Sequence, residues 1–418
     1  MSLKGKKLLL LGGSNSTDDI RRFAGENGVI LAATAPLKYG DTPLKRIAAE
    51  AYETDASDTE GLVRLVSEAH IDGIFPGNNE DIMPHAIAAA EATGLPCYSS
   101  TESWDRCANK AKFKAMCRQN GIPVAGEYDL GRTNAGDILY PVVVKPADSC
   151  GSQGFSICHR PEELDPAVEK ALPFSRTGTV LVEDFVPYDA AIIHYTLAGG
   201  EAMFCGISDK KSMLLGSDGG SVMALQIFPS VNTEEYLATL HGKVSRMFLD
   251  AGMHDGPVWI EAFNNSGHFI FNEMGYRFGG SMTYHPIRYF YGVDQLEFML
   301  RYALGEEPDL RRHNSLIRHD RPAGKKYSIL PLHVRPGIIE RIVGADEVKA
   351  MPEVYAYVPI HGEGDHIRGT GTVQQVFCYL HLLCDDMDDL SRTVSVICTK
   401  LKVYNENSEN ILFRLYNF

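Results

Sequence analysis

The sequence predicts a protein of mixed α/β and α+β class, with an N-terminal parallel-sheet domain, a central domain of two α+β lobes and a small C-terminal α+β domain. Up to about residue 100, short β-branched runs alternate with helical patterns, which indicates a parallel sheet with crossover helices. Between residues 140 and 275, strand patterns that end in Gly-rich or acidic turns are interleaved with helices. After about residue 311, further strand patterns accompany one long helical pattern.

In the first hundred residues, each expected strand is a short apolar run that ends near Gly, Ala or Asn. The expected strands are 8–11, 29–33 and 73–76, and the expected helices are 18–24 and 82–90. Loops after the carboxyl ends of parallel strands are where this architecture binds ligands. Gly12-Gly13 is only part of a dinucleotide-binding fingerprint, so it does not by itself predict a cofactor there.

Composition limits the class of protein. The chain has 418 residues, enough for roughly two or three domains, and its hydrophobic content of 44% is that of an ordinary globular protein. The formal charge of −14 argues against a dedicated nucleic-acid or anionic-membrane surface. Nine scattered cysteines without paired spacing favour free thiols in a reducing cytoplasm, and no apolar run has the length of a membrane span.

A helix is expected between Ser100 and Asn120, where Asn120-Gly121 ends the pattern. Lys110, Lys112 and Lys114 give this helix a basic run. By itself such a run is most simply a solvated face.

A strand that ends in Lys145 is followed by a loop of small residues that includes Gly151, Ser152, Gln153 and Gly154. Backbone N–H groups of such a loop can close on phosphate oxygens, and a lysine adds a compact charge. The loop is not a Walker A motif, because Gly-Lys-Ser/Thr is absent. A lysine in an otherwise apolar strand needs an anionic partner, which favours phosphate binding over an ordinary turn.

Two apolar runs around Asn265-Ser266-Gly267 predict a β-hairpin with a three-residue loop. In that register Phe271 faces Glu261, and Glu273 shares the face of Glu261 at roughly 7–8 Å, whereas an even loop would separate the two acids. Two carboxylates on one face repel each other unless a cation neutralises them. Magnesium is commonly held by one or two carboxylates together with nucleotide phosphates, so this pair predicts a magnesium site.

Directly after Glu273 the chain offers groups that bind anions. Arg277 supplies a planar guanidinium, and Gly279-Gly280-Ser281 supplies backbone donors that could receive a carboxylate or phosphate. The nearby His285 is best explained as a structural histidine.

These motifs resemble the metal-binding end of the ATP-grasp superfamily, whose carboxylate–amine ligases typically end in Glu-x-Asn-x-Arg-x-Gly-Gly. Glu273, Arg277 and Gly279-Gly280 match this pattern, but Gly275 stands where the family usually has Asn as a further metal ligand. The resemblance is strong over roughly residues 5–300 and weak beyond. It implies that the N-terminal segment is a pre-ATP-grasp domain whose tip, residues 78–80, borders the active site.

The resemblance also implies roles for individual residues. In the family, lysines at the positions of Lys110 and Lys145 contact nucleotide phosphates, and the backbone at the positions of Asp184 to Val186 reads the adenine. The implied ATP-binding set is Lys110, Lys145, Gly151, Ser152, Gln153, Gly154, Glu183, Asp184, Phe185 and Val186, with Asp189 for the ribose. The implied metal ligands are Glu261 and Glu273, for Mg²⁺ with Mn²⁺ as an alternative, and Arg277 and Lys145 are the implied catalytic residues.

The second half of the chain adds elements without assigned chemistry. Expected strands are 192–197, 202–207, 326–332, 354–358 and 411–415; expected helices are 233–251 and 387–401; a loop is expected at 210–220. The acidic cluster at 385–389 is explained as a helix start. The expected domains are 1–105, 106–310 with a lid at about 120–186, and 311–418.

The function implied by the resemblance is an ATP- and Mg²⁺-dependent ligase. It would phosphorylate a small-molecule carboxylate to an acyl phosphate, releasing ADP, and attack by an amine would then release phosphate. A cytoplasmic homodimer without nucleic-acid or membrane partners is expected. The alternatives are a bicarbonate-activating enzyme of the carboxylase or carbamoyl-phosphate type, and a non-catalytic ATP-binding regulatory protein with a decayed site.

Overall fold

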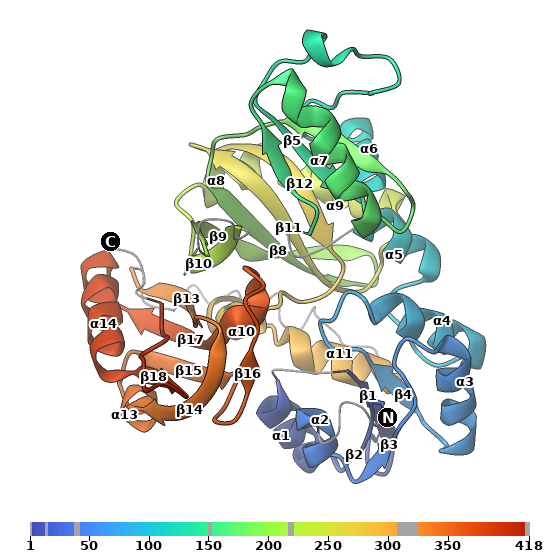
Figure 1. The fold of residues 1–418 in the computed structure, drawn as a ribbon. Helices are drawn as coiled ribbons and strands as arrows, with labels where there is room; N and C mark the ends of the chain where they lie inside the picture. Colours follow the sequence, from blue (N-terminus) through green and yellow to red (C-terminus); the bar gives the residue numbers. More distant parts are fainter. Residues whose placement is uncertain are drawn as a thin grey trace.

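The computed structural model describes residues 2–12, 16–36, 42–148, 153–215, 221–306 and 324–413. Figure 1 shows an N-terminal parallel sheet, a small lid-like sheet and a C-terminal part arranged around a large central sheet. This layout confirms the mixed α/β and α+β class. The domain boundaries at residues 105 and 310 stay predictions.

The N-terminal sheet is parallel, with strand order β3-β2-β1-β4. Leu8 to Leu11 are all buried, as expected when helices cover both faces of a parallel sheet. The elements are β1 (Lys7–Leu11), α1 (Thr17–Asn27), β2 (Ile30–Thr34), α2 (Pro43–Ile47), β3 (Glu50–Tyr52), α3 (Thr59–Glu68), β4 (Gly73–Phe75) and α4 (Met83–Thr93). No pattern in the sequence predicted β3, α2 or α3, which are short or weakly apolar.

Between residues 100 and 120 there are two helices, α5 (Thr101–Ala108) and α6 (Lys110–Gln119), where the sequence predicted one. The break falls at Asn109, whose side-chain Oδ1 accepts from the Lys112 N–H at 3.1 Å. An Asn that caps the second helix adopts an extended backbone and ends the first.

The lid-like part is a three-stranded antiparallel sheet with order β6-β5-β7, covered by one helix. Its elements are η2 (Ala135–Asp137), β5 (Val142–Pro146), β6 (Ser156–Cys158), η3 (Pro161–Glu163), α7 (Leu164–Ala171), η4 (Leu172–Phe174) and β7 (Val180–Asp184). Val142, Val144 and Val182 form its core against Leu164 and Ala167 of α7. Lys145 therefore sits near the end of a central strand, as the sequence predicted.

The central sheet has eight antiparallel strands in the order β12-β11-β8-β9-β10-β13-β17-β15. These are β8 (Ala190–Ala198), β9 (Glu201–Leu214), β10 (Ser221–Phe228), β11 (Gly256–Asn265), β12 (His268–Gly275), β13 (Lys326–His333), β15 (Val354–Pro359) and β17 (Val376–Cys384). The loop expected from residue 210 is wrong, because β9 continues to Leu214; residues 216–220 lie outside the described residues. The β10–β13 pairing joins the central and C-terminal parts in one sheet.

Alternate residues of the central sheet face opposite layers. Ile193, Val258 and Ile260 pack against helices α8 (Thr233–Thr239) and α9 (His241–Asp250), which replace the single helix expected at 233–251. The other face carries Glu261 and the rest of the site described below. Helix α11 (Gln295–Ala303) contacts both β4 and β11, and so lies between the N-terminal and central sheets (Figure 1).

The C-terminal part adds a second sheet with order β16-β14-β18. Its elements are β14 (Gly337–Val343), α13 (Ala345–Lys349), β16 (His366–Ile367), η5 (Val373–Gln375), α14 (Met387–Lys400) and β18 (Lys402–Asn405). Asp386 caps α14 by accepting from the Asp389 N–H at 2.8 Å, which confirms the predicted helix start. The strand expected at 411–415 is reduced to bridges at Asn410 and Leu412, and residues 414–418 lie outside the described residues.

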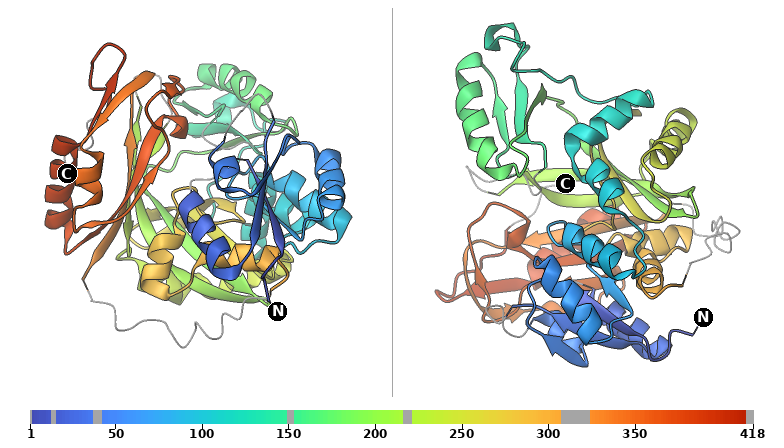
Figure 2. Two further views of the ribbon diagram at one scale, coloured as in Figure 1. Left: turned by 90° about the horizontal axis from the view of Figure 1, so that it is seen from below. Right: turned by 90° about the vertical axis from the view of Figure 1, so that its right-hand side faces the viewer.

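The N-terminal sheet and the C-terminal part lie on opposite sides of the molecule, as the left view of Figure 2 shows. Among the described helices, none is long and apolar enough to cross a membrane.

Candidate active site

The hairpin of β11 and β12 has a two-residue loop, Ser266-Gly267, so the predicted three-residue loop is wrong. Both loop residues have positive φ, 50° for Ser266 and 96° for Gly267. Two-residue turns with φ above zero match the twist of antiparallel strands, which is why they are common in hairpins. Asn265, expected in the loop, pairs with His268 at the end of the ladder.

A β-bulge then restores the same-face placement that the even loop would have destroyed. Ala262 pairs with Phe271, but Glu261 pairs with Glu273, so Asn272 is the extra residue of the bulged strand. The two glutamates lie directly opposite each other instead of on a diagonal. The prediction that they share a face is confirmed, although the reason given for it was wrong.

Each glutamate is paired with a lysine. Lys110 Nζ lies 3.2 Å from Glu273 Oε2, and Lys210 Nζ lies 2.5 Å from Glu261 Oε2. Burial raises the pKa of Glu273, but the nearby Lys110, Lys145 and Lys210 more than offset it and hold the pKa below its ordinary value. Lys210 was missed because its segment was read as a loop; the alternation of β9, continued from Ser208, was the available signal.

Lys145 lies at the centre of a second cluster. Its Nζ is 2.9 Å from Glu183 Oε2 and donates to Asn272 Oδ1 at 2.7 Å. The other oxygen of Glu183 pairs with Lys114, whose side chain is 0% exposed. Burial lowers the pKa of Lys114 to about 8. Glu183 thus joins two lysines, and its role toward ATP stays a prediction.

The basic run that includes Lys114 was interpreted from the sequence as a solvated helix face, and for Lys114 that interpretation is wrong. It lies four residues after Lys110, on the helix face that also carries Phe113 and Cys117, both fully buried. This spacing was the signal in the sequence that could have predicted its burial.

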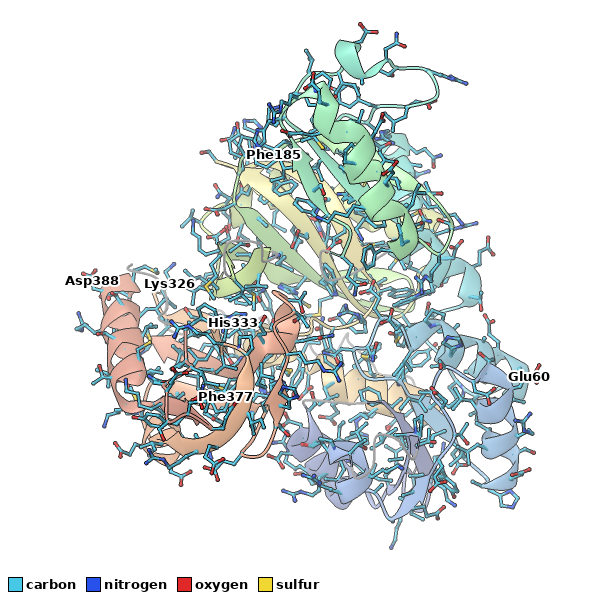
Figure 3. All side chains as sticks on the ribbon, in the orientation of Figure 1. Glu60, Phe185, Lys326, His333, Phe377 and Asp388 are labelled. Atoms are coloured by element: carbon cyan, nitrogen blue, oxygen red, sulfur yellow. The ribbon has the colours of Figure 1, made fainter. Side chains whose placement is uncertain are left out.

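The strand end predicted to bind adenine lies where β7 leaves the lid-like sheet, and Figure 3 labels Phe185 there. The Asp184 N–H donates to Gly126 O at 2.9 Å, and the Phe185 N–H donates to Pro141 O at 3.2 Å. Asp184 also accepts from the Tyr128 hydroxyl at 2.8 Å. These contacts engage two of the three backbone N–H groups expected near the base.

The remaining described residues that were predicted to bind the nucleotide take no part in the lysine–glutamate ion pairs described above. Asp189 is exposed and paired with Lys211, and Val186 follows β7. Gln153 is exposed, whereas Gly154 is buried with a φ of 71°. Gly151 and Ser152 lie outside the described residues. The binding roles of all these residues stay predictions.

Arg277 is brought against the N-terminal domain. It donates to Glu80 Oε2 at 2.7 Å and to Phe278 O at 3.0 Å, so the 78–80 tip lies against Arg277. That this tip borders an active site stays a prediction. Its Nε has no hydrogen-bond partner among the described residues, and its guanidinium lies over the Trp259 ring at 5.4 Å. The Gly279 N–H, expected to be available for an anion, instead donates to Thr283 Oγ1 at 3.1 Å.

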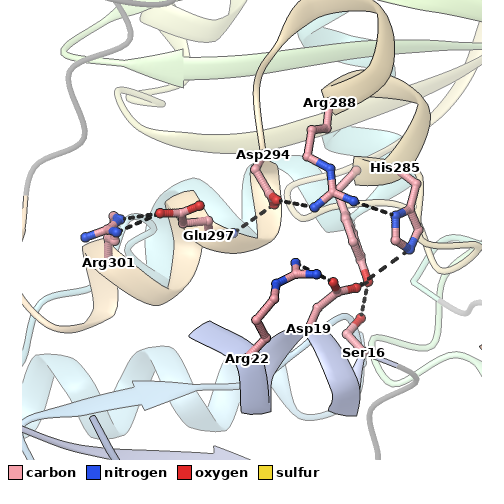
Figure 4. A network of polar contacts seen from close by, with 9 residues as sticks. Ser16, Asp19, Arg22, His285, Arg288, Asp294, Glu297 and Arg301 are labelled. Atoms are coloured by element: carbon pink, nitrogen blue, oxygen red, sulfur yellow. Dashed lines mark hydrogen bonds and ion pairs between the residues drawn. The ribbon is translucent and has the colours of Figure 1, made fainter. Parts of the chain in front are cut away.

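A polar network holds helix α10 (Tyr284–Tyr291) against the N-terminal domain (Figure 4). The Tyr284 hydroxyl donates to Asp19 Oδ2 at 2.8 Å, and Arg22 pairs with the same carboxylate at 2.7 Å. Burial lowers the pKa of His285 to about 4, so the ring is neutral. This agrees with the structural role expected for His285.

Gly275, the departure from the family pattern, is explained by Trp259. The two residues are cross-strand partners, and a Cβ at position 275 would overlap the Trp259 indole. No side chain fits at position 275 while Trp259 keeps its place. The indole Nε1 is buried without a hydrogen-bond partner among the described residues.

This packing predicts a strong coupling between the two positions. Gly275→Ala is expected to lower the unfolding midpoint by an amount that corresponds to about 1–3 kcal/mol of overpacking. In a Trp259→Ala background the same change should cost far less, because the space is open. A double-mutant cycle by urea unfolding measures the difference; equal costs in both backgrounds would contradict the overlap.

The residues present suit a Mg²⁺ ion held partly by phosphates better than a metal held by protein ligands alone. No cluster of three or more His, Cys, Asp or Glu suited to a metal occurs in the described parts of the chain. The opposed carboxylates of Glu261 and Glu273 and the amide of Asn272 offer hard oxygen ligands. Mg²⁺ is usually held by one or two protein carboxylates together with phosphate oxygens. The lysines paired with these acids are the groups that phosphates would attract.

Comparison with known proteins places this arrangement in context. Residues 109–208 match the family described as D-ala D-ala ligase C-terminus. The chain is 27% identical over 207 residues to the formate-dependent phosphoribosylglycinamide formyltransferase of Wolinella succinogenes, covering 48% of this chain and 53% of that protein. It thus spans about half the length of this relative. It is also 27% identical over 405 residues to the uncharacterized protein y4rH of Sinorhizobium fredii, covering 89% of this chain and 79% of that one.

Solved structures share the fold over nearly the whole chain. The L-amino acid ligase from Bacillus licheniformis superposes with a TM-score of 0.78 at 20% identity, covering 97% of this chain and all of that one. The biotin carboxylase domain dimer of Hydrogenobacter thermophilus 2-oxoglutarate carboxylase, described with MgADP, ADP and bicarbonate, gives 0.76 at 19% identity over 95% of this chain and 90% of that one. The family match is limited to residues 109–208, and the solved structures show that the chain shares their fold over nearly its whole length.

Proposed function

We propose that this chain is an ATP- and Mg²⁺-dependent ligase that activates a small-molecule carboxylate as an acyl phosphate and joins it to an amine. The observation that carries the proposal is the cluster of Lys110, Lys145 and Lys210 around the opposed Glu261 and Glu273. Such a set can hold the phosphates of ATP and a cation at the same time. Phosphoryl transfer depends mostly on positioning and charge neutralisation of this kind.

The ion pairs support an exchange of partners on binding. When triphosphate oxygens approach, Lys110 and Lys210 gain a more highly charged anion, and Glu273 and Glu261 become available to a cation. Bound Mg²⁺ would supply Lewis-acid polarisation of the phosphoryl oxygens. The depressed pKa of Glu273 keeps its carboxylate ionised and ready for this role at neutral pH.

Arg277 is the group best suited to the carboxylate or acyl phosphate. Its guanidinium is fixed by Glu80 and by the Phe278 carbonyl, and its Nε keeps one donor without a partner among the described residues. A fixed, desolvated donor stabilises charge that develops during transfer because it needs no reorganisation. Both acids, the lysines and Arg277 are present, which favours an enzyme over a non-catalytic ATP-binding protein.

The finer parts of the proposal follow the resemblance. ATP is bound with Mg²⁺, with Mn²⁺ as an alternative ion, and the protein acts as a cytoplasmic homodimer on a carboxylate and an amine. The matched Hydrogenobacter structure, described as a domain dimer with MgADP, supports the nucleotide and the dimer only by analogy.

Product analysis tests the chemistry. With pooled carboxylic and amino acids, ATP and Mg²⁺, the expected products are ADP and phosphate, and hydroxylamine should trap the activated acid as a hydroxamate. AMP and pyrophosphate as the stoichiometric products would contradict the mechanism. ATP turnover that requires bicarbonate and yields no hydroxamate would favour the bicarbonate-activating alternative, and ATP binding without turnover would favour the regulatory one.

A further inference from the structure

We propose that Asn272 supplies a side-chain ligand to the metal site, from the bulge in β12, and thereby replaces the side chain that Gly275 lacks. The proposal rests on the proposed function, because it concerns the same Mg²⁺ site. It assigns a role to a residue that the sequence pattern alone gives no reason to choose.

The bulge is what brings Asn272 to the site. In a regular ladder, successive residues point to opposite faces, so a residue next to Glu273 would face the helices behind the sheet. Because Asn272 is the extra residue between the Glu261–Glu273 and Ala262–Phe271 pairs, its side chain leaves that alternation. Its amide lies on the acidic face, where it contacts both Lys145 and Glu261.

The position two residues after Glu273 is closed to any side chain. Gly275 shares the face of Glu273, but the Trp259 indole occupies the volume where a Cβ would lie. The guanidinium of Arg277 lies over the same indole, 5.4 Å from the ring centroid. Consequently an amide ligand on this strand can come from Asn272 and not from position 275.

The present contacts of Asn272 show how its amide can serve a cation. Oδ1 accepts from Lys145 Nζ at 2.7 Å, and Nδ2 donates to Glu261 Oε1 at 3.1 Å. The carboxamide is nearly symmetric in shape, so a rotation of about 180° at its terminal torsion exchanges oxygen and nitrogen. With a cation on Glu261, the rotated amide would offer its oxygen to that cation and its N–H to an anion held by Lys145.

Binding of Mn²⁺ to the full-length protein with ADP tests the proposal. Free Mn²⁺ measured by electron paramagnetic resonance gives the metal affinity of the protein–ADP complex, and calorimetry without metal gives the affinity for ADP alone. For Asn272→Ala we expect Mn²⁺ affinity to fall by about tenfold or more, while metal-free ADP affinity changes less than about twofold. Asn265→Ala, on the same hairpin but at its far end, is the matched control and should change neither.

Other outcomes separate ligation from positioning. If Asn272→Ala weakens metal-free ADP binding and leaves Mn²⁺ affinity unchanged, Asn272 only positions Lys145 and the proposal is overturned; no change in either quantity overturns it too. Asn272→Asp keeps an oxygen at the same place and should bind Mn²⁺ at least as tightly as the wild type, which also covers the case of a poorly folded Ala variant. Failure of the wild-type protein with ADP to bind Mn²⁺ would instead defeat the proposed function itself.

Discussion

Glu273→Gln is expected to lower Mg²⁺-dependent ATP turnover by about three orders of magnitude, which corresponds to roughly 4 kcal/mol of transition-state stabilisation. The change removes one charge with almost no change in volume, and it relieves repulsion from the directly opposed Glu261. Folding should therefore survive. ADP release at saturating ATP and Mg²⁺ gives the turnover, and circular dichroism checks the fold.

Glu297→Gln is the matched control for this prediction. Glu297 lies on α11 and pairs with Arg301 at 2.7 Å, but Arg301 keeps Glu306 as a second partner at 2.8 Å. The control should retain nearly full turnover. Wild-type activity in the Glu273→Gln protein would mean that Glu273 does not hold the metal.

The second large effect is expected on stability. Glu183→Gln removes the anionic partner of Lys114, which is fully buried, and of Lys145. Removing one partner of a buried ion pair costs about 3–5 kcal/mol, because the other charge stays desolvated. The urea midpoint of the variant should fall accordingly, whereas Glu127→Gln, which breaks a more exposed pair with Arg118, should cost at most about 1 kcal/mol.

A double variant tests whether the loss of stability comes from the unpaired charge of Lys114. Lys114→Met combined with Glu183→Leu replaces the pair by apolar groups and should recover most of the stability. Nucleotide binding should be impaired in both the single and the double variant, because Lys145 has lost Glu183 in each. If the double variant is as unstable as Glu183→Gln, packing and not charge accounts for the loss.

The pH dependence of stability has a definite sign at Glu183. Burial raises its pKa, but Lys145 and Lys114 offset that effect and hold the pKa below the ordinary value of 4.5. The folded protein therefore releases this proton more readily than the unfolded chain, and the resulting stability is present above pH 4.5. It is lost as the pH falls below 4.5 toward the folded-state pKa, and the Glu183→Gln variant should lack this part of the acid transition.

Sequence patterns predicted the parts of the site that depend on local order. Glu261 and Glu273 were identified because the two strands of the predicted hairpin carry one carboxylate each, and Lys145 and Arg277 because each stands near glycine-containing turn residues. The shared face of Glu261 and Glu273 was predicted from a wrong loop length, and only the bulge at Asn272 made the outcome right. A bulge depends on how two strands pair, so no periodicity within one strand reveals it.

Other features depend on contacts between distant segments. The pairing of Lys114 with Glu183 and of Lys210 with Glu261 joins residues 69 and 51 positions apart, and neither is visible as a motif. The same holds for the central sheet. The sequence predicted β13 and β17 as strands of a separate domain, but nothing in their composition shows that β13 pairs with β10.

That pairing has a consequence during protein synthesis. Gln226, Ile227 and Phe228 of β10 pair with residues 327–329, which leave the ribosome roughly 100 residues later. At about 5–20 residues per second, β10 is an open sheet edge for roughly 5–20 s. An apolar edge in a nascent chain is a template for aggregation. Recombinant chains that stop before β13 should therefore depend on chaperones and precipitate, while the full-length chain covers its own edge.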